Sequence, residues 1–80
     1  MMENDIRQLL TQTFPQAHIA IELEGGHCHI TVVSDVFIDK TKLQRQQMIN
    51  RLLGSMIAEG HLHALHLQTY TSQEWEALNG

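Results

Sequence analysis

The chain has 80 residues, a length that predicts one domain spanning residues 1–80. Hydrophobic residues make up 42% and charged residues 18%, which is typical of a folded protein and excludes a disordered chain. The net charge of −4 argues against a protein whose whole surface binds nucleic acid. So short a chain buries too little surface to enclose a substrate, and we therefore expect no enzymatic activity.

Cysteine and histidine counts point to a reducing compartment and to soft-ligand chemistry. The single cysteine excludes an internal disulfide, which favours the cytoplasm. The acidic, polar first residues do not resemble a targeting peptide, and no apolar run approaches the roughly 18 residues of a membrane span. We therefore expect a cytoplasmic protein without a membrane segment. Five of the six histidines fall in two groups: His27, His29, His61, His63 and His66.

The first predicted element is a helix over about residues 4–13. Its apolar residues recur at spacings of three and four, and Asn4 or Asp5 is suited to cap it. Pro15 ends it.

A β-hairpin is predicted next. Apolar and polar residues alternate over 17–24, which indicates a half-buried strand. Gly25 and Gly26 favour a tight turn. The β-branched run over 28–34 predicts the second strand.

A packed connection and a long helix follow. Residues 34–41 contain Val36, Phe37 and Ile38, which are too apolar for a free loop, so we expect this segment to pack on the core. From residue 41 or 42 to about 58 the apolar spacing predicts a helix that Gly60 ends. The residues that show this spacing are Ile49, Leu52, Leu53, Met56 and Ile57.

The last elements are a strand over 62–69 and a short helix. The strand places Leu65 and Leu67 on one face. Thr71 and Glu74 form the ends of a capping box. We expect the final helix to carry Trp75 and Leu78 into the core.

The predicted order is α-β-β-α-β-α, which belongs to the α+β class. The second and third strands are joined by a helical crossover and should therefore run parallel. The expected product is a three-stranded mixed sheet with the helices on one face.

This topology gathers potential metal ligands at one end of the sheet. Parallel strands begin at the same edge, so Cys28 and His63 should meet there, close to His27 and His29. Imidazole and thiolate are ligands for zinc, copper or an iron–sulfur cluster. The set matches no standard zinc spacing, which indicates a site shared with a partner. The alternatives are that Cys28 is a small buried hydrophobe and that His63 is a core histidine. His18 and His66 are expected to be exposed and without function.

Four short motifs follow one another along the chain. They are Val32-Val33-Ser34-Asp35-x-Phe37, Lys40-Thr41, Leu62-His63-Ala64-Leu65 and Thr69-x-Thr71-x-x-Glu74-Trp75. In this order and spacing they resemble the BolA family, over about residues 4–78. The length and the short hairpin resemble its compact, YrbA-like bacterial branch. Asp39 stands where the family usually has glycine, and Gln46-Gln47 replaces a basic pair.

The resemblance implies a fold like the type II KH domain and a non-enzymatic role. It implies a monothiol glutaredoxin as partner, with a bridging [2Fe-2S] cluster that glutathione and the glutaredoxin cysteine also ligate, in iron–sulfur trafficking or in iron or stress regulation. The family's histidine ligand matches His63. The second ligand comes from the loop between the first two strands, where Cys28 is the first choice, because thiolate binds iron more strongly, and His27 the second. His29 lies in the same loop.

Histidine ligation implies a labile, proton-sensitive cluster. An imidazole ligand must be neutral, so acid near the ordinary histidine pKa of about 6.5 should weaken the complex. The region over 36–51 and the last helix are expected to dock the partner. Alone, the chain is expected to be a monomer or a weak homodimer.

A basic segment supports a second hypothesis, a DNA-binding transcriptional regulator. Its basic residues fall within twelve positions of an acidic chain: Lys40, Lys42, Arg45 and Arg51. No Gly-x-x-Gly loop is present, and no aromatic residue lies among them to stack on bases. The alternatives are a solvated helix face and the surface that docks the partner.

Overall fold

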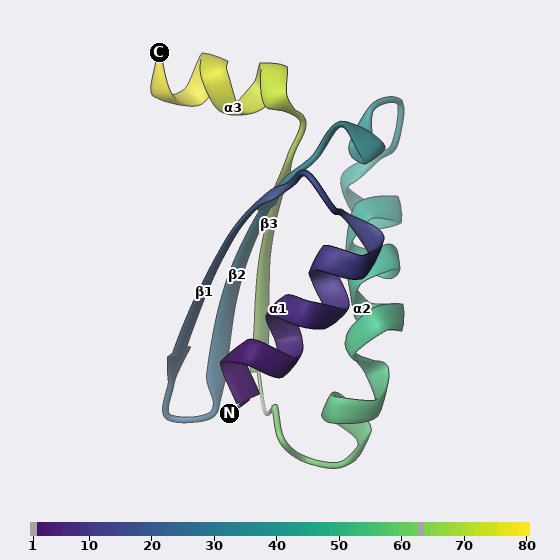
Figure 1. Ribbon diagram of the computed structural model, residues 1–80, viewed down its shortest axis with the longest axis vertical. Coiled ribbons are helices and arrows are strands. Elements are labelled where there is room, and N and C mark those ends of the chain that lie inside the picture. Colours follow the sequence, from purple (N-terminus) through teal and green to yellow (C-terminus); the bar gives the residue numbers. More distant parts are fainter. Residues whose placement is uncertain (1, 63) are drawn as a thin grey trace.

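The computed structural model describes residues 2–62 and 64–80, and its elements follow the predicted order. They are α1 (Met2–Thr13), β1 (His18–Glu24), β2 (His27–Val33), the 3-10 helix η1 (Asp35–Phe37), α2 (Lys42–Ala58), β3 (Ala64–Tyr70) and α3 (Ser72–Asn79) (Figure 1). The α+β class is thereby confirmed. No helix in the described part of the chain is long and apolar enough to cross a membrane.

Two helices begin at reciprocal capping boxes. The Thr41 hydroxyl accepts from the Gln44 backbone N–H while the Gln44 side chain accepts from the Thr41 N–H, and Thr71 and Glu74 repeat this arrangement. Each box satisfies backbone donors that the first turn leaves free, which fixes where α2 and α3 begin. The prediction for α1 was wrong at its start: the helix begins at Met2, so Asn4 lies in its first turn and does not cap it.

The hairpin between β1 and β2 turns at two glycines in the left-handed region. Gly25 has φ +56° and Gly26 has φ +85°, conformations that side chains with a Cβ rarely adopt. The antiparallel register that results pairs Glu24 with His27 and Glu22 with His29.

The parallel pairing of β2 with β3 completes the sheet. In the described residues the sheet has three strands in the order β1-β2-β3, with α2 as the connection between the parallel pair. His27 lies opposite Ala64, and His29 lies opposite His66. The mixed sheet predicted from the sequence is confirmed.

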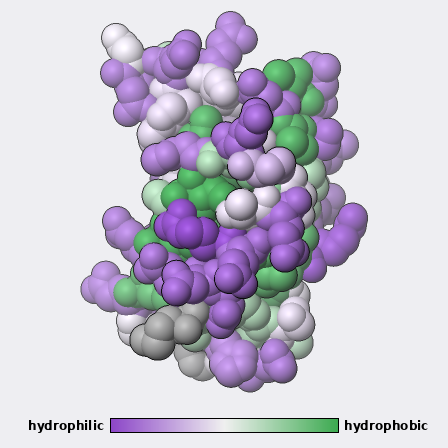
Figure 2. Space-filling view, in the orientation of Figure 1, coloured by the Kyte–Doolittle hydropathy of each residue, from purple (hydrophilic) through white to green (hydrophobic). Residues whose placement is uncertain are grey.

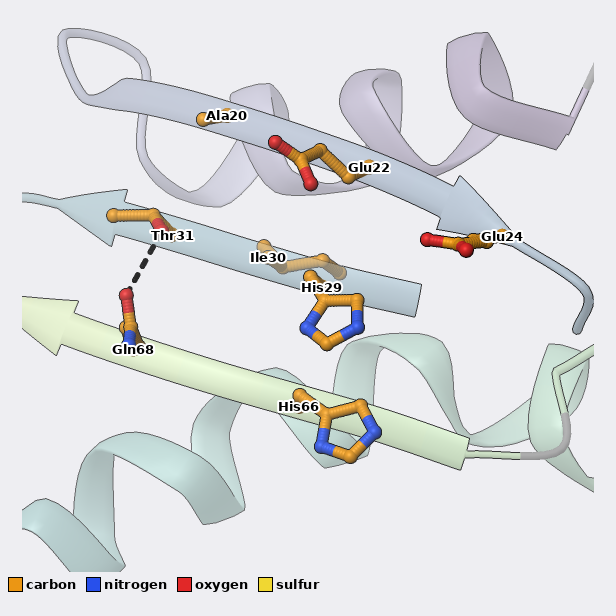
Figure 3. A pocket seen from close by; sticks show the side chains of 8 residues that line it. All are labelled: Ala20, Glu22, Glu24, His29, Ile30, Thr31, His66 and Gln68. Atoms are coloured by element: carbon orange, nitrogen blue, oxygen red, sulfur yellow. Dashed lines mark hydrogen bonds between the residues drawn. The ribbon is translucent and has the colours of Figure 1, made fainter. Parts of the chain in front are cut away.

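Helices α1 and α2 cover the same face of the sheet. The buried core joins residues of both helices to the inward-facing residues of β2: Ile6, Leu10, Ile49, Leu53, Cys28, Ile30 and Val32. Alternation along the strands therefore directs apolar side chains to these helices and leaves the opposite face of the sheet uncovered. Figure 3 looks onto that opposite face, with the helices behind the strands.

The expectation that α3 adds to the core was wrong. α3 follows the end of β3 almost at once and lies beyond the strand ends (Figure 1), where the core between the sheet and the other helices has ended. Leu78 is 63% exposed. Trp75 is half-buried and packs beside His18 and Tyr70, with ring centroids 5.8 Å and 5.3 Å away.

The connection after β2 packs on the core through one residue. Phe37 is fully buried, and its ring centroid lies 5.2 Å from that of Phe14. Val36 and Ile38 are 42% and 52% exposed, so the expectation that the whole segment packs inward was only partly right. Figure 2 shows apolar surface at its upper right, where η1 lies in Figure 1.

Leucines at two positions of α2 test this division between core and surface. Leu53 is fully buried and Leu43 is 63% exposed. Leu53→Ala should lower the free energy of unfolding by about 2–5 kcal/mol, because it removes apolar contacts and leaves a cavity. Leu43→Ala should change it by no more than about 0.5 kcal/mol. Urea denaturation followed by circular dichroism measures both, and equal losses would contradict the assigned core.

Candidate functional site

At the start of β2, strand alternation puts the thiol ligand and the imidazole ligands on opposite faces of the sheet. Cys28 points into the core and is 0% exposed, while His27 and His29 are exposed on the opposite face. Burial raises the pKa of the Cys28 thiol. Because the thiolate is the form that binds metals, burial removes the reason for preferring Cys28 as a ligand. The alternative of a small buried hydrophobe describes its position.

The uncovered face of the sheet carries most of the histidines. We call it the open face and define it by the outward-facing residues of the three strands: His18, Ala20, Glu22, Glu24, His27, His29, Thr31, Ala64, His66 and Gln68. Most of these residues are polar or charged, in contrast to the apolar face under α1 and α2, and the face continues toward α3 with Val33 and Tyr70.

Three imidazole rings lie together on the open face. The rings of His29 and His66 stack with centroids 4.5 Å apart and planes inclined by 12°. The Nδ1 atom of His27 and the Nε2 atom of His66 are 3.5 Å apart. Figure 3 shows the His29 and His66 rings side by side on neighbouring strands. His66, expected from sequence to have no role, is therefore exposed as predicted but touches both histidines of β2.

A shallow hollow of about 290 Å³ lies on this face. Its lining comes from all three strands: Ala20, Glu22, Glu24, His29, Ile30, Thr31, His66 and Gln68. Glu22 and Glu24 extend from β1 beside the imidazoles (Figure 3). The hollow is too open to enclose a substrate, but it combines carboxylate and imidazole groups of the kind that bind cations.

The structure describes only some of the ligands predicted from the sequence. His63, the first choice, lies outside the described residues. Cys28 lies opposite Leu65 within the sheet, while His27 lies opposite Ala64. Within residues 2–62 and 64–80 no group of three or more histidine, cysteine, aspartate or glutamate side chains is arranged to hold a metal ion.

Two residues of the predicted basic patch form hydrogen bonds within the chain. Arg45 is 4% exposed and forms two hydrogen bonds to the Glu74 carboxylate, of 2.7 Å and 3.1 Å, so its assignment to a phosphate-binding surface was wrong. It also donates to the backbone carbonyls of Lys40 and Thr69. The Lys42 amine donates to the same Thr69 carbonyl and lies 4.9 Å from the Tyr70 ring centroid. Lys40 and Arg51 remain as the basic side chains of this segment whose charged groups have no hydrogen-bond partner among the described residues.

Comparison with known proteins identifies the relatives of this chain. The sequence profile of the family described as BolA-like protein matches residues 8–74. The acid stress protein IbaG of Escherichia coli is 26% identical over 83 residues, which cover 100% of this chain and 99% of that protein. The DNA-binding transcriptional regulator BolA of Vibrio cholerae is 40% identical over 54 residues, which cover 68% of this chain and 50% of that protein.

A solved structure shares the fold. BolA1 from Arabidopsis thaliana superimposes with a TM-score of 0.81 at 23% sequence identity, over 89% of this chain and 92% of that one.

The ion pair between Arg45 and Glu74 predicts an acid-dependent loss of stability. The Arg45 hydrogen bonds, followed by the Thr71 backbone N–H, lower the pKa of Glu74 from its ordinary value of 4.5 to about 2. The folded protein therefore holds this carboxylate ionised where the unfolded chain already binds a proton. The stabilisation is complete above pH 4.5 and is lost as the pH falls toward 2. Glu74→Gln should lower Tm at neutral pH, and the difference from the unsubstituted protein should shrink over that range.

The matched control is Glu76→Gln, which changes an exposed carboxylate on the same helix. At every pH, the Tm of Glu76→Gln should equal that of the unsubstituted protein. Thermal melts from neutral pH to pH 2 measure both variants, and a Tm difference for Glu74→Gln that stays constant with pH would contradict the assignment.

Proposed function

The chain belongs to the BolA-like family, and we propose that it is a non-enzymatic protein that partners a monothiol glutaredoxin and donates histidine to a shared [2Fe-2S] cluster. The glutaredoxin cysteine and glutathione supply the remaining ligands. The role is iron–sulfur trafficking or iron and stress regulation, and the name of the acid stress protein IbaG fits the stress role.

The observation that carries this proposal is the parallel register of β2 and β3. His27 lies opposite Ala64, the chain neighbour of His63. The β1–β2 loop and the start of β3 therefore lie at one edge of the sheet, where residues of both segments can reach a single cluster. This arrangement supports a cluster site shared by the two proteins. The chain needs no pocket of its own, because the partner covers the other side of the cluster.

We assign the second ligand to His27 in place of Cys28. The His27 imidazole is exposed, whereas the Cys28 thiol is fully buried. Imidazole fits the chemistry, since histidines replace cysteines on one iron in Rieske centres. A cluster held in this way has a raised reduction potential and a ligand that exchanges more easily, which suits a protein that must pass its cluster on.

An apolar patch at the other end of the molecule supports the expected docking region. Val36, Ile38 and Leu43 are 42%, 52% and 63% exposed, and all lie within the segment over 36–51. A contiguous exposed apolar surface is typical of sites that bind another protein, whereas single exposed apolar side chains are common on any protein. The patch supports a second contact with the partner, at the opposite end of the sheet from the shared cluster.

A titration into cluster-loaded monothiol glutaredoxin tests the proposal. Visible absorption and circular dichroism should change until one equivalent is added. His63→Ala should abolish the change, and His27→Ala should alter the final spectrum, because each removes an imidazole ligand. His18→Ala is the matched control on the open face and should behave as the unsubstituted protein, as should Cys28→Ala if that variant remains folded.

Two results of this titration would contradict the proposal or its ligand assignment. An unchanged cluster spectrum, together with no complex on a sizing column, would exclude a shared cluster. A spectrum that Cys28→Ala alters and His27→Ala does not would return the second ligand to Cys28.

The second candidate function is DNA binding, because one relative is named a DNA-binding transcriptional regulator. With Arg45 paired to Glu74, the contact would depend on Lys40 and Arg51. Replacing both by alanine should weaken binding to duplex DNA and reduce the slope of log affinity against log salt by about two. Binding that is unaffected by the double substitution would exclude this surface.

A further inference from the structure

Two imidazoles of the open face meet through their ring nitrogens. His27 Nδ1 and His66 Nε2 are 3.5 Å apart, the ring planes are inclined by 14°, and the centroids are 5.8 Å apart. The centroid separation is close to the nitrogen separation plus one ring radius on each side. The rings therefore meet edge to edge, with the two nitrogens directed at each other.

We propose that His27 and His66 together bind one divalent transition-metal cation, with zinc as the best fit. Two nitrogens at about 2.0–2.1 Å from a tetrahedral zinc ion are about 3.3 Å apart, close to the observed separation. Because the two facing nitrogens point at each other, each ring must first turn within the plane that the two rings nearly share before both lone pairs meet at one zinc ion. The described residues offer no third convergent ligand, so water completes the coordination.

A third imidazole holds one ligand in place. His29 lies opposite His66 in the parallel register, and their rings stack at 4.5 Å. The stack restricts rotation of the His66 ring, which reduces the entropy lost when a metal binds. His29 is therefore a positioning residue for His66.

The charge of the surrounding face favours a cation. Glu24 lies opposite His27, and Glu22 lies opposite His29. Both carboxylates line the hollow beside the imidazoles, and its eight lining residues include no lysine or arginine (Figure 3). The local field therefore attracts a positive ion to this part of an acidic protein.

Metal binding needs only a change of tautomer. In the neutral pair one ring donates its N–H to the other ring's nitrogen. When zinc replaces this proton, the donor ring carries its hydrogen on its other nitrogen, and both facing nitrogens become ligands. The zinc ion loses two water molecules, and no net proton is released.

This site goes beyond the proposed function, because His66 has no part in the shared cluster. His27 belongs to both, so zinc and the cluster exclude each other at that residue. The test therefore uses the chain alone, without glutaredoxin, and its outcome is independent of the cluster titration.

The experiment is a zinc titration followed by calorimetry and by NMR of the ¹⁵N-labelled histidine rings. One zinc ion should bind, with the largest shifts at His27 Nδ1 and His66 Nε2. His27→Ala and His66→Ala should each weaken binding about tenfold or more. His18→Ala, on the same face, should bind as the unsubstituted protein does. Magnesium should not bind, since it prefers oxygen ligands.

Any of four results would overturn the proposal. Three of them are no zinc binding, unchanged affinity in His66→Ala, and a loss in His63→Ala that equals or exceeds the loss in His66→Ala. An equal loss in His18→Ala would show scattered surface binding and would also overturn it. Circular dichroism verifies that each variant is folded, which the exposure of His18, His27 and His66 should permit at those three positions.

Discussion

The parallel pairing of β2 with β3 is the constraint on which the rest of the structure depends. It requires α2 as a crossover, which places that helix over one face of the sheet beside α1 and leaves the other face open. It also brings the β1–β2 loop and the start of β3 to the same edge. A shift of one residue in this register would separate His29 from His66. It would also turn the core-facing side chains of one strand to the opposite face of the sheet.

A second constraint acts at the other end of the sheet. Arg45 of α2 joins the carbonyl of Thr69 on β3 to the Glu74 carboxylate on α3, and Glu74 also accepts from the Thr71 backbone N–H. One buried guanidinium thus fixes where three elements meet. In the basic segment over 40–51, Arg45 is buried and stabilises the fold, whereas Arg51 is exposed to solvent.

Local pattern predicted the elements and their order, because alternation, helical spacing and capping boxes act over a few residues. The errors came from long-range contacts. Arg45 is buried and binds the carboxylate of Glu74, which lies 29 positions away. No local sequence pattern predicts this pair. Leu78 has helical spacing, but its helix lies beyond the core. Strand alternation puts Cys28 on the same face as Ile30, which is the core face, although Cys28 was preferred as a ligand from the sequence. The contact of His66 with His27 depends on a parallel register that sequence alone did not fix.

We propose that this chain donates imidazole nitrogen to a shared cluster. The most direct measurement is electron–nuclear double resonance on the reduced complex, with ¹⁵N-histidine incorporated only into this chain. We expect a ¹⁵N coupling to the cluster that disappears in His63→Ala. A complex that forms with its cluster intact and shows no ¹⁵N coupling would contradict it.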